Sequence, residues 1–377
     1  MVLFVGRTVE RDAIRAALRE RAGILVAGEA GSGRSRLLTE ATAALETSRT
    51  RVCRISGVET EVPYGAFAHL LPGSPGPVNP IRWAADIVAG DLPLILAVDD
   101  AHLLDPRSAA LVRHLVVHRG ARLVATTLSG TDLPRPITSL WKDGLVSRLD
   151  LRPLSPQDSA RLAAAMLGGP VEELTARRLW HATRGNVSFL VEIISSGSFT
   201  QTGGVWWWRG ELVLSERLRT LAETGLGRLD EAEREVLEFV ALGEPLDLDA
   251  LVTLTSPDAV EGVERRGLVT VVPHGSRLRV RLAHPIHGQI IRSWCGPVRT
   301  RNRLERVVRL RGPDEGTGGA ELSARELEIA RLASWNLTNR EIAGWLTLSP
   351  RTVANHLCRV YTKLGVNDRK DLALLLV

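Results

Sequence analysis

The chain contains few cysteines and no long apolar run. Its three cysteines, Cys53, Cys295 and Cys358, lie far apart, and their spacing is not that of a disulfide framework or a metal site. Scattered thiols are typical of a reducing compartment. The apolar runs are only as long as strands, whereas a membrane-spanning helix needs roughly 20 residues, and no basic stretch with an apolar core opens the chain. These absences predict a cytoplasmic protein without a membrane partner.

A net charge is absent from most of the chain. Residues 1–296 hold 34 basic and 34 acidic residues, whereas residues 297–377 hold 14 basic and 9 acidic residues and so carry the whole net charge of +5. A local basic excess favours nucleic-acid binding. The arginines between Arg299 and Arg311 contribute part of it, and they could instead form only a solvated basic linker. The length of 377 residues predicts two or three domains.

Three helix starts follow one another in the last sixty residues. Ser323 with Glu326, and Thr338 with Glu341, have the spacing of capping boxes, in which each side chain bonds the backbone N–H of the other residue. A serine then precedes Pro350, the favoured first residue of a helix. Two short helices joined by a tight turn predict a helix-turn-helix, with residues 350–364 as the recognition helix in the major groove.

This segment resembles the LuxR-type DNA-binding domain from about Leu322 to the C-terminus. The resemblance rests on Leu322–Ser323, Glu326, Asn339–Ala343, Ser349, Thr352–Val353, His356, Lys363–Val366 and Arg369. It implies that Ala354, Asn355 and Cys358 lie nearest the base edges, where Asn355 could pair with adenine. The residues expected at double-stranded promoter DNA are Thr338, Asn339, Arg351, Thr352, Ala354, Asn355, Cys358, Arg359, Lys363 and Arg369. Self-association on paired half-sites and contact with RNA polymerase are further expectations.

A glycine-rich loop without its usual lysine follows the first predicted strand, residues 23–27. The loop consists of Gly28, Glu29, Ala30, Gly31, Ser32, Gly33, Arg34 and Ser35. It has the frame G-x-x-x-x-G-K-[ST], with Arg34 in the place of lysine, and a predicted helix follows it. In such a loop, backbone N–H groups and a helix start surround phosphates, and Ser35 would hold Mg²⁺. A plain glycine turn is the alternative.

Two carboxylates end a buried-strand pattern at residues 93–98. Asp99 would complete the Mg²⁺ shell, and Asp100 could orient or deprotonate a water molecule, which makes it a possible catalytic residue. The alternative is a strand followed by a capping aspartate. Asp105, before a proline, is expected to be a helix cap. Further strands at residues 51–56, 122–127 and 145–151 alternate with helices and predict a parallel α/β sheet.

These pieces together resemble the STAND class of signal-transducing ATPases, and more narrowly the large ATP-binding LuxR-family regulators. The resemblance is carried by Phe4–Arg7, Gly28–Ser35, Val98–Asp105, Leu151–Leu154 and Arg184–Asn186. It implies ATP or ADP with Mg²⁺ as cofactor, with Gly6 and Arg7 near the adenine. Arg34, Val187 in place of a proline, and Leu128 in place of a polar sensor depart from the family. A guanidinium does not replace an ammonium conservatively, so nucleotide binding is expected without efficient turnover.

The expected fold is multidomain. It comprises a P-loop NTPase-like α/β domain (1–152), a helical lid (153–200), a winged-helix-like domain (201–296), a basic flexible linker (297–320) and an all-α helix-turn-helix domain (321–377). Three consecutive tryptophans at 206–208 mark a hairpin and are expected to pack rather than form a ligand platform. The helical-repeat region of the large regulators is not found in this sequence.

Three functions remain open from the sequence. The first is a DNA-binding transcriptional regulator in which the nucleotide state biases assembly and DNA binding. The second is a DNA-binding regulator whose N-terminal region is a degenerate scaffold. The third is an active P-loop ATPase for which the C-terminus is only a tether; Arg34 argues against it.

Overall fold

The computed structural model describes residues 4–73, 79–208, 212–274, 277–311, 322–334, 337–364 and 372. The chain divides into two compact units, Met1–Gly225 and Leu226–Val377. Each unit is described by itself.

The first unit is built on a five-stranded parallel sheet. Its strands are β1 (Gly23–Gly28), β2 (Arg51–Ser56), β3 (Leu94–Asp99), β4 (Arg122–Leu128) and β5 (Val146–Leu151), in the order β2-β3-β4-β1-β5. All five strands were predicted, and the predicted parallel α/β sheet is confirmed. In the register, Gly23 pairs with Leu123 on one side and Val146 on the other. Because the strands are parallel, the loop after β1 and the carboxylates after β3 lie at the same edge.

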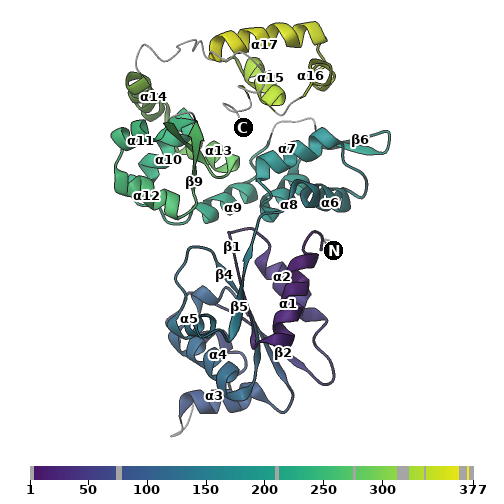
Figure 1. Cartoon of the computed structure of the whole chain (residues 1–377), viewed down its shortest axis with the longest axis vertical. Coiled ribbons are helices and arrows are strands. Elements are labelled where there is room, and N and C mark those ends of the chain that lie inside the picture. The colour runs from purple at the N-terminus through teal and green to yellow at the C-terminus, as the bar shows by residue number, and fades with distance from the viewer. Residues whose placement is uncertain are drawn as a thin grey trace. The chain divides into compact units, whose positions relative to one another are not determined.

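Helices cover both faces of this sheet (Figure 1). Ile24 and Val26 of β1 pack with α1 (Thr8–Glu20) and α2 (Arg34–Ala43). The alternate residue, Leu25, packs on the opposite face with α3 (Pro80–Ala89), α4 (Pro106–Arg119) and α5 (Arg135–Lys142). A strand buried on both faces reads as a continuous apolar run, which is why β1 and β3 were clearly visible in the sequence.

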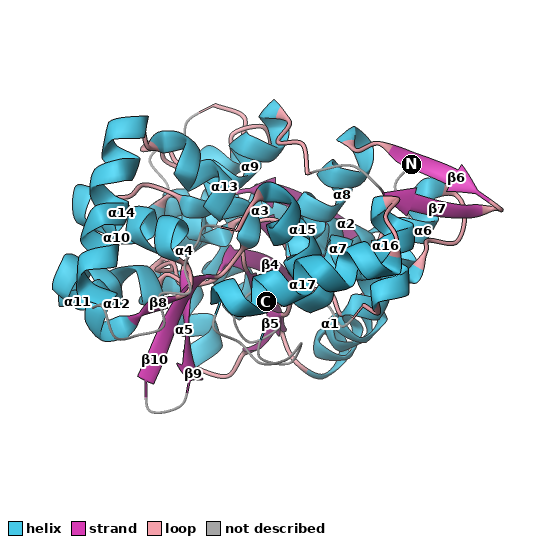
Figure 2. Cartoon of the chain, turned by 90° about the horizontal axis from the view of Figure 1, so that it is seen from above, coloured by secondary structure: helices cyan, strands magenta, loops and turns pink. Residues whose placement is uncertain are grey.

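A helical lid follows the sheet. It contains α6 (Pro156–Leu167), α7 (Glu173–Thr183) and α8 (Val187–Ser196), then a hairpin of β6 (Phe199–Thr202) and β7 (Val205–Trp208), shown in Figure 2, and α9 (Glu216–Leu226). The hairpin was predicted, but it packs on the lid and not on a domain that starts at residue 201. The N–H of Trp206 donates to Pro170 O at 2.8 Å, and Trp208 is buried beneath the Arg178 guanidinium.

The second unit begins with the predicted helices and hairpin. Its elements are α10 (Glu231–Gly243), β8 (Leu246–Asp247), α11 (Leu248–Leu254), α12 (Pro257–Arg265), β9 (Val269–His274), β10 (Arg277–Leu282) and α13 (Pro285–Trp294). The strands form an antiparallel sheet in the order β8-β10-β9. Three helices followed by a hairpin were expected from the sequence and are present, while their assignment as a winged helix stays a prediction.

The stretch expected to start a flexible linker is instead a helix, α14 (Pro297–Arg311). Glu238 of α10, whose exposed fraction is 1%, forms ion pairs with Arg299 Nε at 2.9 Å and Arg303 Nε at 2.8 Å. Val307 is buried in the core of the same module. The prediction was wrong because an arginine run was treated as solvated charge, whereas Arg299, Arg303 and Arg306 face glutamates of α10. The linker residues 312–320 lie outside the described residues.

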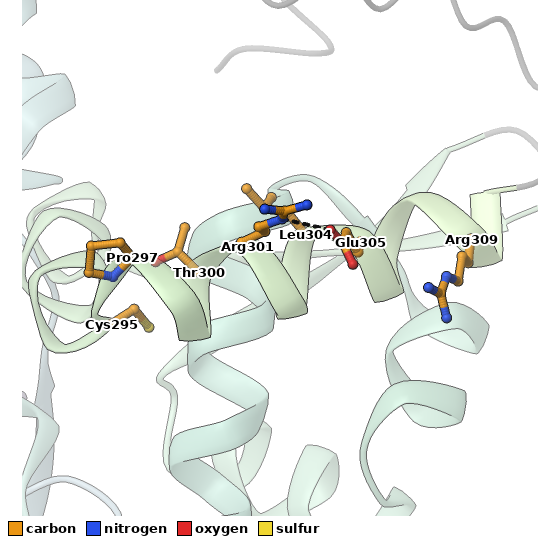
Figure 3. A pocket seen from close by; sticks show the side chains of 7 residues that line it. All are labelled: Cys295, Pro297, Thr300, Arg301, Leu304, Glu305 and Arg309. Atoms are coloured by element: carbon orange, nitrogen blue, oxygen red, sulfur yellow. Dashed lines mark hydrogen bonds and ion pairs between the residues drawn. The ribbon is translucent and has the colours of Figure 1, made fainter.

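The other side of α14 borders a cavity of about 790 Å³. Figure 3 shows the ion pair between Arg301 and Glu305, one turn apart, along the middle of its wall. Leu304 and Thr300 line it beside this pair, and Cys295 lies at one end. The described wall therefore comes from α14 and the residues just before it.

The last described helices are α15 (Ala324–Ser334), α16 (Asn339–Leu346) and α17 (Pro350–Leu364). Both predicted capping boxes are present. The N–H of Glu326 donates to Ser323 Oγ at 3.2 Å, and the N–H of Ser323 donates to Glu326 Oε2 at 2.8 Å. Thr338 and Glu341 make the matching pair at α16. The expected stop at Gly365 lies outside the described residues.

Glu326 has a second partner at the far end of α17. Lys363 Nζ donates to Glu326 Oε2 at 2.7 Å. The hydrogen bond from Lys363, followed by that from the Ser323 backbone, lowers the pKa of Glu326 from 4.5 to about 2. One carboxylate therefore caps α15 and ties the last turn of α17 to it.

In the first unit, Asp105 holds two segments together. Its carboxylate caps α4 by accepting from the N–H groups of Arg107 and Ser108. It also accepts from the N–H groups of Tyr64 and Gly65, each at 3.1 Å. The side chain is buried, so it serves as more than the helix cap predicted from the sequence.

We expect Asp105→Ala to lower the free energy of unfolding by about 2–4 kcal/mol, because the cap is lost and two further N–H groups lose their acceptor. Asn79→Ala is the matched control, since Asn79 caps α3 before a proline but is exposed; it should cost about 1 kcal/mol. Urea unfolding of the full chain measures both. Equal costs would show that the contacts to Tyr64 and Gly65 contribute no stability.

The Glu326–Lys363 pair should make the C-terminal helices sensitive to acid. Since the folded pKa of Glu326, about 2, lies below its ordinary value of 4.5, the pair stabilises the fold above pH 4.5 and loses this contribution as the pH falls towards 2. The unfolding temperature should fall as the pH is lowered across this range, and it should fall less in Lys363→Gln than in the unchanged protein. The same decline in both proteins would contradict a role for the pair.

Candidate functional site

The loop after β1 needs glycine where it meets the lid. Gly31 has a φ of +76°, and a Cβ there would lie 2.5 Å from Asn186 Oδ1. Gly33, with a φ of +91°, is the last residue before α2. Both backbone conformations are costly for residues with a side chain. The sequence motif therefore folds into a tight loop that opens onto the N-terminus of α2.

The lid is bonded directly to this loop. Asn186 Nδ2 donates to Ala30 O at 2.8 Å, and the N–H of Ser188 donates to Gly31 O at 3.0 Å. Arg7, which is buried, donates to Ser32 O at 3.3 Å. Gly6 lies against Asp158 of the lid, since an added Cβ would be 2.8 Å from Asp158 Cβ. The structure thus brings Gly6–Arg7 and the lid turn to the loop, and a shared nucleotide site there stays a prediction.

The loop has features that fit a phosphate. Ser32 Oγ is buried without a hydrogen-bond partner among the described residues. It points into the loop, because a Cβ added to Gly28 would lie 2.7 Å from it. The first N–H groups of a helix have no intrahelical acceptor and attract anions. A buried hydroxyl and the start of α2 therefore offer donors to a nucleotide phosphate.

Arg34 is folded back across the loop. Its Nη1 donates to Gly28 O at 2.7 Å, and its Nη2 forms an ion pair with Asp100 Oδ1 at 3.2 Å. The side chain is only 12% exposed. Burial lowers the pKa of Arg34, and the charges of Asp100 and Asp99 oppose this effect. The cation that replaces the usual lysine is thus already paired within the protein.

Thr126 of β4 contacts the Asp99 carboxylate at the end of β3 and the backbone of Asp100, and sequence reasoning missed both contacts. Its hydroxyl donates to Asp99 Oδ1, and it accepts from the N–H of Asp100 at 2.9 Å. Asp100 has a left-handed φ of +45°. The signal that could have found Thr126 is its polar side chain near the end of β4, the strand that pairs with β3.

His102 and Ser35 complete the surroundings of this edge. The N–H of Leu128 donates to His102 Nδ1 at 3.4 Å, and burial lowers the pKa of His102. Ser35 is exposed in the first turn of α2. Within the residues that the structure describes, no cluster of three or more His, Cys, Asp or Glu side chains could hold a metal ion. The Mg²⁺ ligands Ser35 and Asp99 stay a prediction.

The second candidate site is the outer face of α17. Val353, Leu357 and Val360 are buried towards α15 and α16. The opposite face presents the exposed side chains of Arg351, Asn355, Cys358 and Arg359, with Ala354 half-buried beside them. The structure therefore places Ala354, Asn355 and Cys358, the residues expected nearest the base edges, on the outer face of this helix.

Other residues expected at DNA have partners inside the bundle. Thr338 is occupied in its capping box, and Thr352 Oγ1 lies 2.8 Å from Ser349 Oγ. Lys363 forms an ion pair with Glu326, so its charge is already neutralised within the helical bundle. Asn339 starts α16. Arg369 lies outside the described residues.

None of the helices in the described part of the chain is long and apolar enough to cross a bilayer.

Comparison with known proteins identifies the C-terminal segment. Residues 320–376 match the family model for bacterial regulatory proteins, luxR family. A protein of Mycobacterium bovis named "Putative HTH-type transcriptional regulator" is 46% identical over 55 residues, which are 15% of this chain and 6% of that protein. The transcriptional regulatory protein LnrK of Bacillus subtilis is 29% identical over 86 residues, 23% of this chain and 36% of LnrK. The chain thus spans a small part of these relatives.

Among solved structures, a signal-transduction ATPase with numerous domains and a tetratricopeptide repeat sensor from Pyrococcus horikoshii is similar. It is 17% identical, the match covers 97% of this chain and 52% of that one, and the TM-score is 0.39. The match to the family of bacterial regulatory proteins, luxR family, covers residues 320–376 of this chain.

Proposed function

We propose that this chain is a transcriptional regulator that binds double-stranded promoter DNA through α17 and uses ATP or ADP at the Gly28–Ser35 loop as a regulatory switch. The observation that carries the proposal is the outer face of α17. A helix seated on two others by Val353, Leu357 and Val360 presents Arg351, Asn355, Cys358 and Arg359 together. Such a helix fits the major groove.

The chemistry of this face supports both kinds of DNA contact. Arg351 and Arg359 carry exposed charges that suit phosphates, which set register rather than sequence preference. Asn355 can donate to and accept from one adenine, and Ala354 can contact a thymine methyl group. Because the polar side chains between these arginines are few and short, we expect a short recognition sequence per helix. Pairs of chains on adjacent half-sites would lengthen it; contact with RNA polymerase at the promoter is part of the same proposal.

The N-terminal loop supports the nucleotide part of the proposal. Ser32 and the first turn of α2 would hold the phosphates, and Ser35 with Asp99 would hold Mg²⁺, which neutralises phosphate charge when bound. The lid turn at Asn186 already reaches this loop. A ligand at the loop therefore touches both sheet and lid, which is the arrangement a switch needs.

Hydrolysis is proposed to be weak or absent. A general base must be available to a water molecule, whereas Asp100 is paired with Arg34. The alternative function, a nucleotide-independent regulator with a degenerate NTPase scaffold, keeps α17 and drops the switch. An active ATPase would need Asp100 free of this pair.

The DNA contacts can be tested on α17 itself. Arg351→Ala should weaken binding to all sequences and lower the salt dependence of log K by about 1, because one phosphate contact is lost. Asn355→Ala should cost about 1–3 kcal/mol at one base pair and relax the preference there. Selection from random DNA, followed by affinity measurements at several salt concentrations, separates the two effects.

Thr362→Ala is the matched control for these variants, because Thr362 is also exposed on α17 but bonds only back to Cys358 O in the described contacts. It should leave affinity and preference unchanged. Loss of sequence preference in Arg351→Ala with none in Asn355→Ala would mean that the helix meets DNA by a different face.

The switch is tested by the affinity for the selected DNA at fixed salt without nucleotide, with ADP and with ATP, each with Mg²⁺. We expect these affinities to differ by about fivefold or more, in the range of ordinary coupling between sites. Gly31→Ala should abolish the difference, because its Cβ would meet Asn186, while DNA binding without nucleotide persists. Equal affinities in the unchanged protein would favour the scaffold alternative.

A further inference from the structure

The Arg34 guanidinium has two acceptors on two different strands. Gly28 ends β1, and Asp100 directly follows β3. The two contacts, 2.7 Å and 3.2 Å, use separate nitrogens of one planar group. A lysine has a single ammonium on a flexible stem and lacks this fork. The replacement of lysine by arginine at this position therefore creates a bridge between the strand ends.

The charge on Arg34 depends on its partner. With 12% of its side chain exposed, Arg34 has lost most of its hydration, and a buried charge without a partner is strongly unfavourable. Asp100, at 32% exposed, supplies the neutralising anion. Any phosphate that enters the loop offers a second anion to the same guanidinium, so the phosphate and Asp100 compete.

Asp100 is held where it is and cannot readily follow the guanidinium. Its backbone has a left-handed φ of +45°, and its N–H donates to Thr126 Oγ1. Its carbonyl lies close to Gly57, where an added Cβ would be 2.2 Å away. The anion that competes with a phosphate is therefore fixed by the backbone of β3 and by its neighbours.

We propose that the Arg34–Asp100 ion pair is a latch that makes the loop discriminate between nucleoside triphosphates and diphosphates. The inference rests on the proposed nucleotide site. In the frame of this loop, the residue at position 34 serves the outermost phosphates. A triphosphate exchanges Asp100 for its terminal phosphate on the guanidinium, whereas a diphosphate reaches the loop amides and leaves more of the pair intact. Arg34 and Asp100 thus act as specificity-determining residues, and Asp100 is a competitor of the phosphate rather than a base.

The latch differs in a measurable way from simple repulsion between Asp100 and a phosphate. Repulsion acts whether or not Arg34 is present, so Asp100→Asn would tighten nucleotide binding equally in both backgrounds. A latch exists only when Arg34 is present. Its contribution therefore appears as a coupling between the two residues, which a double-mutant cycle isolates.

The experiment is calorimetric titration of the full chain with Mg²⁺ and either a non-hydrolysable ATP analogue or ADP. The proteins are the unchanged chain, Arg34→Ala, Asp100→Asn and the double variant. We expect Asp100→Asn to tighten triphosphate binding by about threefold or more beyond its effect in the Arg34→Ala background, within the usual range for contacting residues. For ADP, the additional tightening that Asp100→Asn causes when Arg34 is present should be smaller than for the triphosphate.

Arg34→Lys keeps the charge and removes the fork, so Asp100→Asn should have a smaller effect in that background as well. The unfolding temperature of each variant shows whether it folds. If Arg34→Ala does not fold, the double-mutant cycle is built with Arg34→Lys instead. If the affinity change caused by Asp100→Asn is the same with and without Arg34, the latch is overturned and the nucleotide site remains. The same conclusion follows if the coupling between the two residues is equal for ADP and the triphosphate. Absence of nucleotide binding in every protein would overturn both.

Discussion

A buried guanidinium that must be neutralised is the constraint on which the N-terminal site depends. Arg34 lies between the ends of β1 and β3, so the parallel sheet decides which anions it can meet. Thr126, from the strand between them, binds the Asp99 carboxylate and accepts from the N–H of Asp100. The geometry of the sheet edge, rather than any single loop residue, therefore sets the charge balance of the site. The lid adds Asn186 and Ser188, which bond the loop tip, so sheet and lid both border the proposed nucleotide site.

The sequence revealed the regular part of this arrangement because its signals are local. A strand buried on both faces is a continuous apolar run, and the glycines of the loop indicate a backbone conformation that other residues rarely adopt. The bond between Thr126 and Asp99 joins strands that are adjacent only in the folded sheet. A threonine in an apolar strand has no local pattern that distinguishes a polar contact from ordinary strand preference, so its role was invisible until the strand order was known.

Charge was the least predictable feature of the second unit. The arginines of α14 were treated as solvent-facing, yet Arg303 contacts Glu238 and stacks over Phe239, which lie 65 and 64 residues away in sequence by their numbering. Lys363 was expected at DNA, yet it is paired with Glu326. In both cases the residue type was read correctly as a cation. The carboxylate partner of each cation lies on another helix, and residue spacing within one helix cannot predict such a pair. The capping boxes, by contrast, are complete within four residues and were predicted fully.

The burial of the α14 ion pairs separates two responses to ionic strength. Mobile ions screen exposed charges over about 10 Å at 0.1 M salt, but they reach a pair enclosed in protein far less. Glu238 is 1% exposed and Arg303 8%, so added salt leaves their pairing largely unchanged. Exposed arginines such as Arg351 and Arg359 of α17 experience the full ionic atmosphere. A salt titration of this protein therefore reports on its outward-facing cations while the attachment of α14 to its module stays constant.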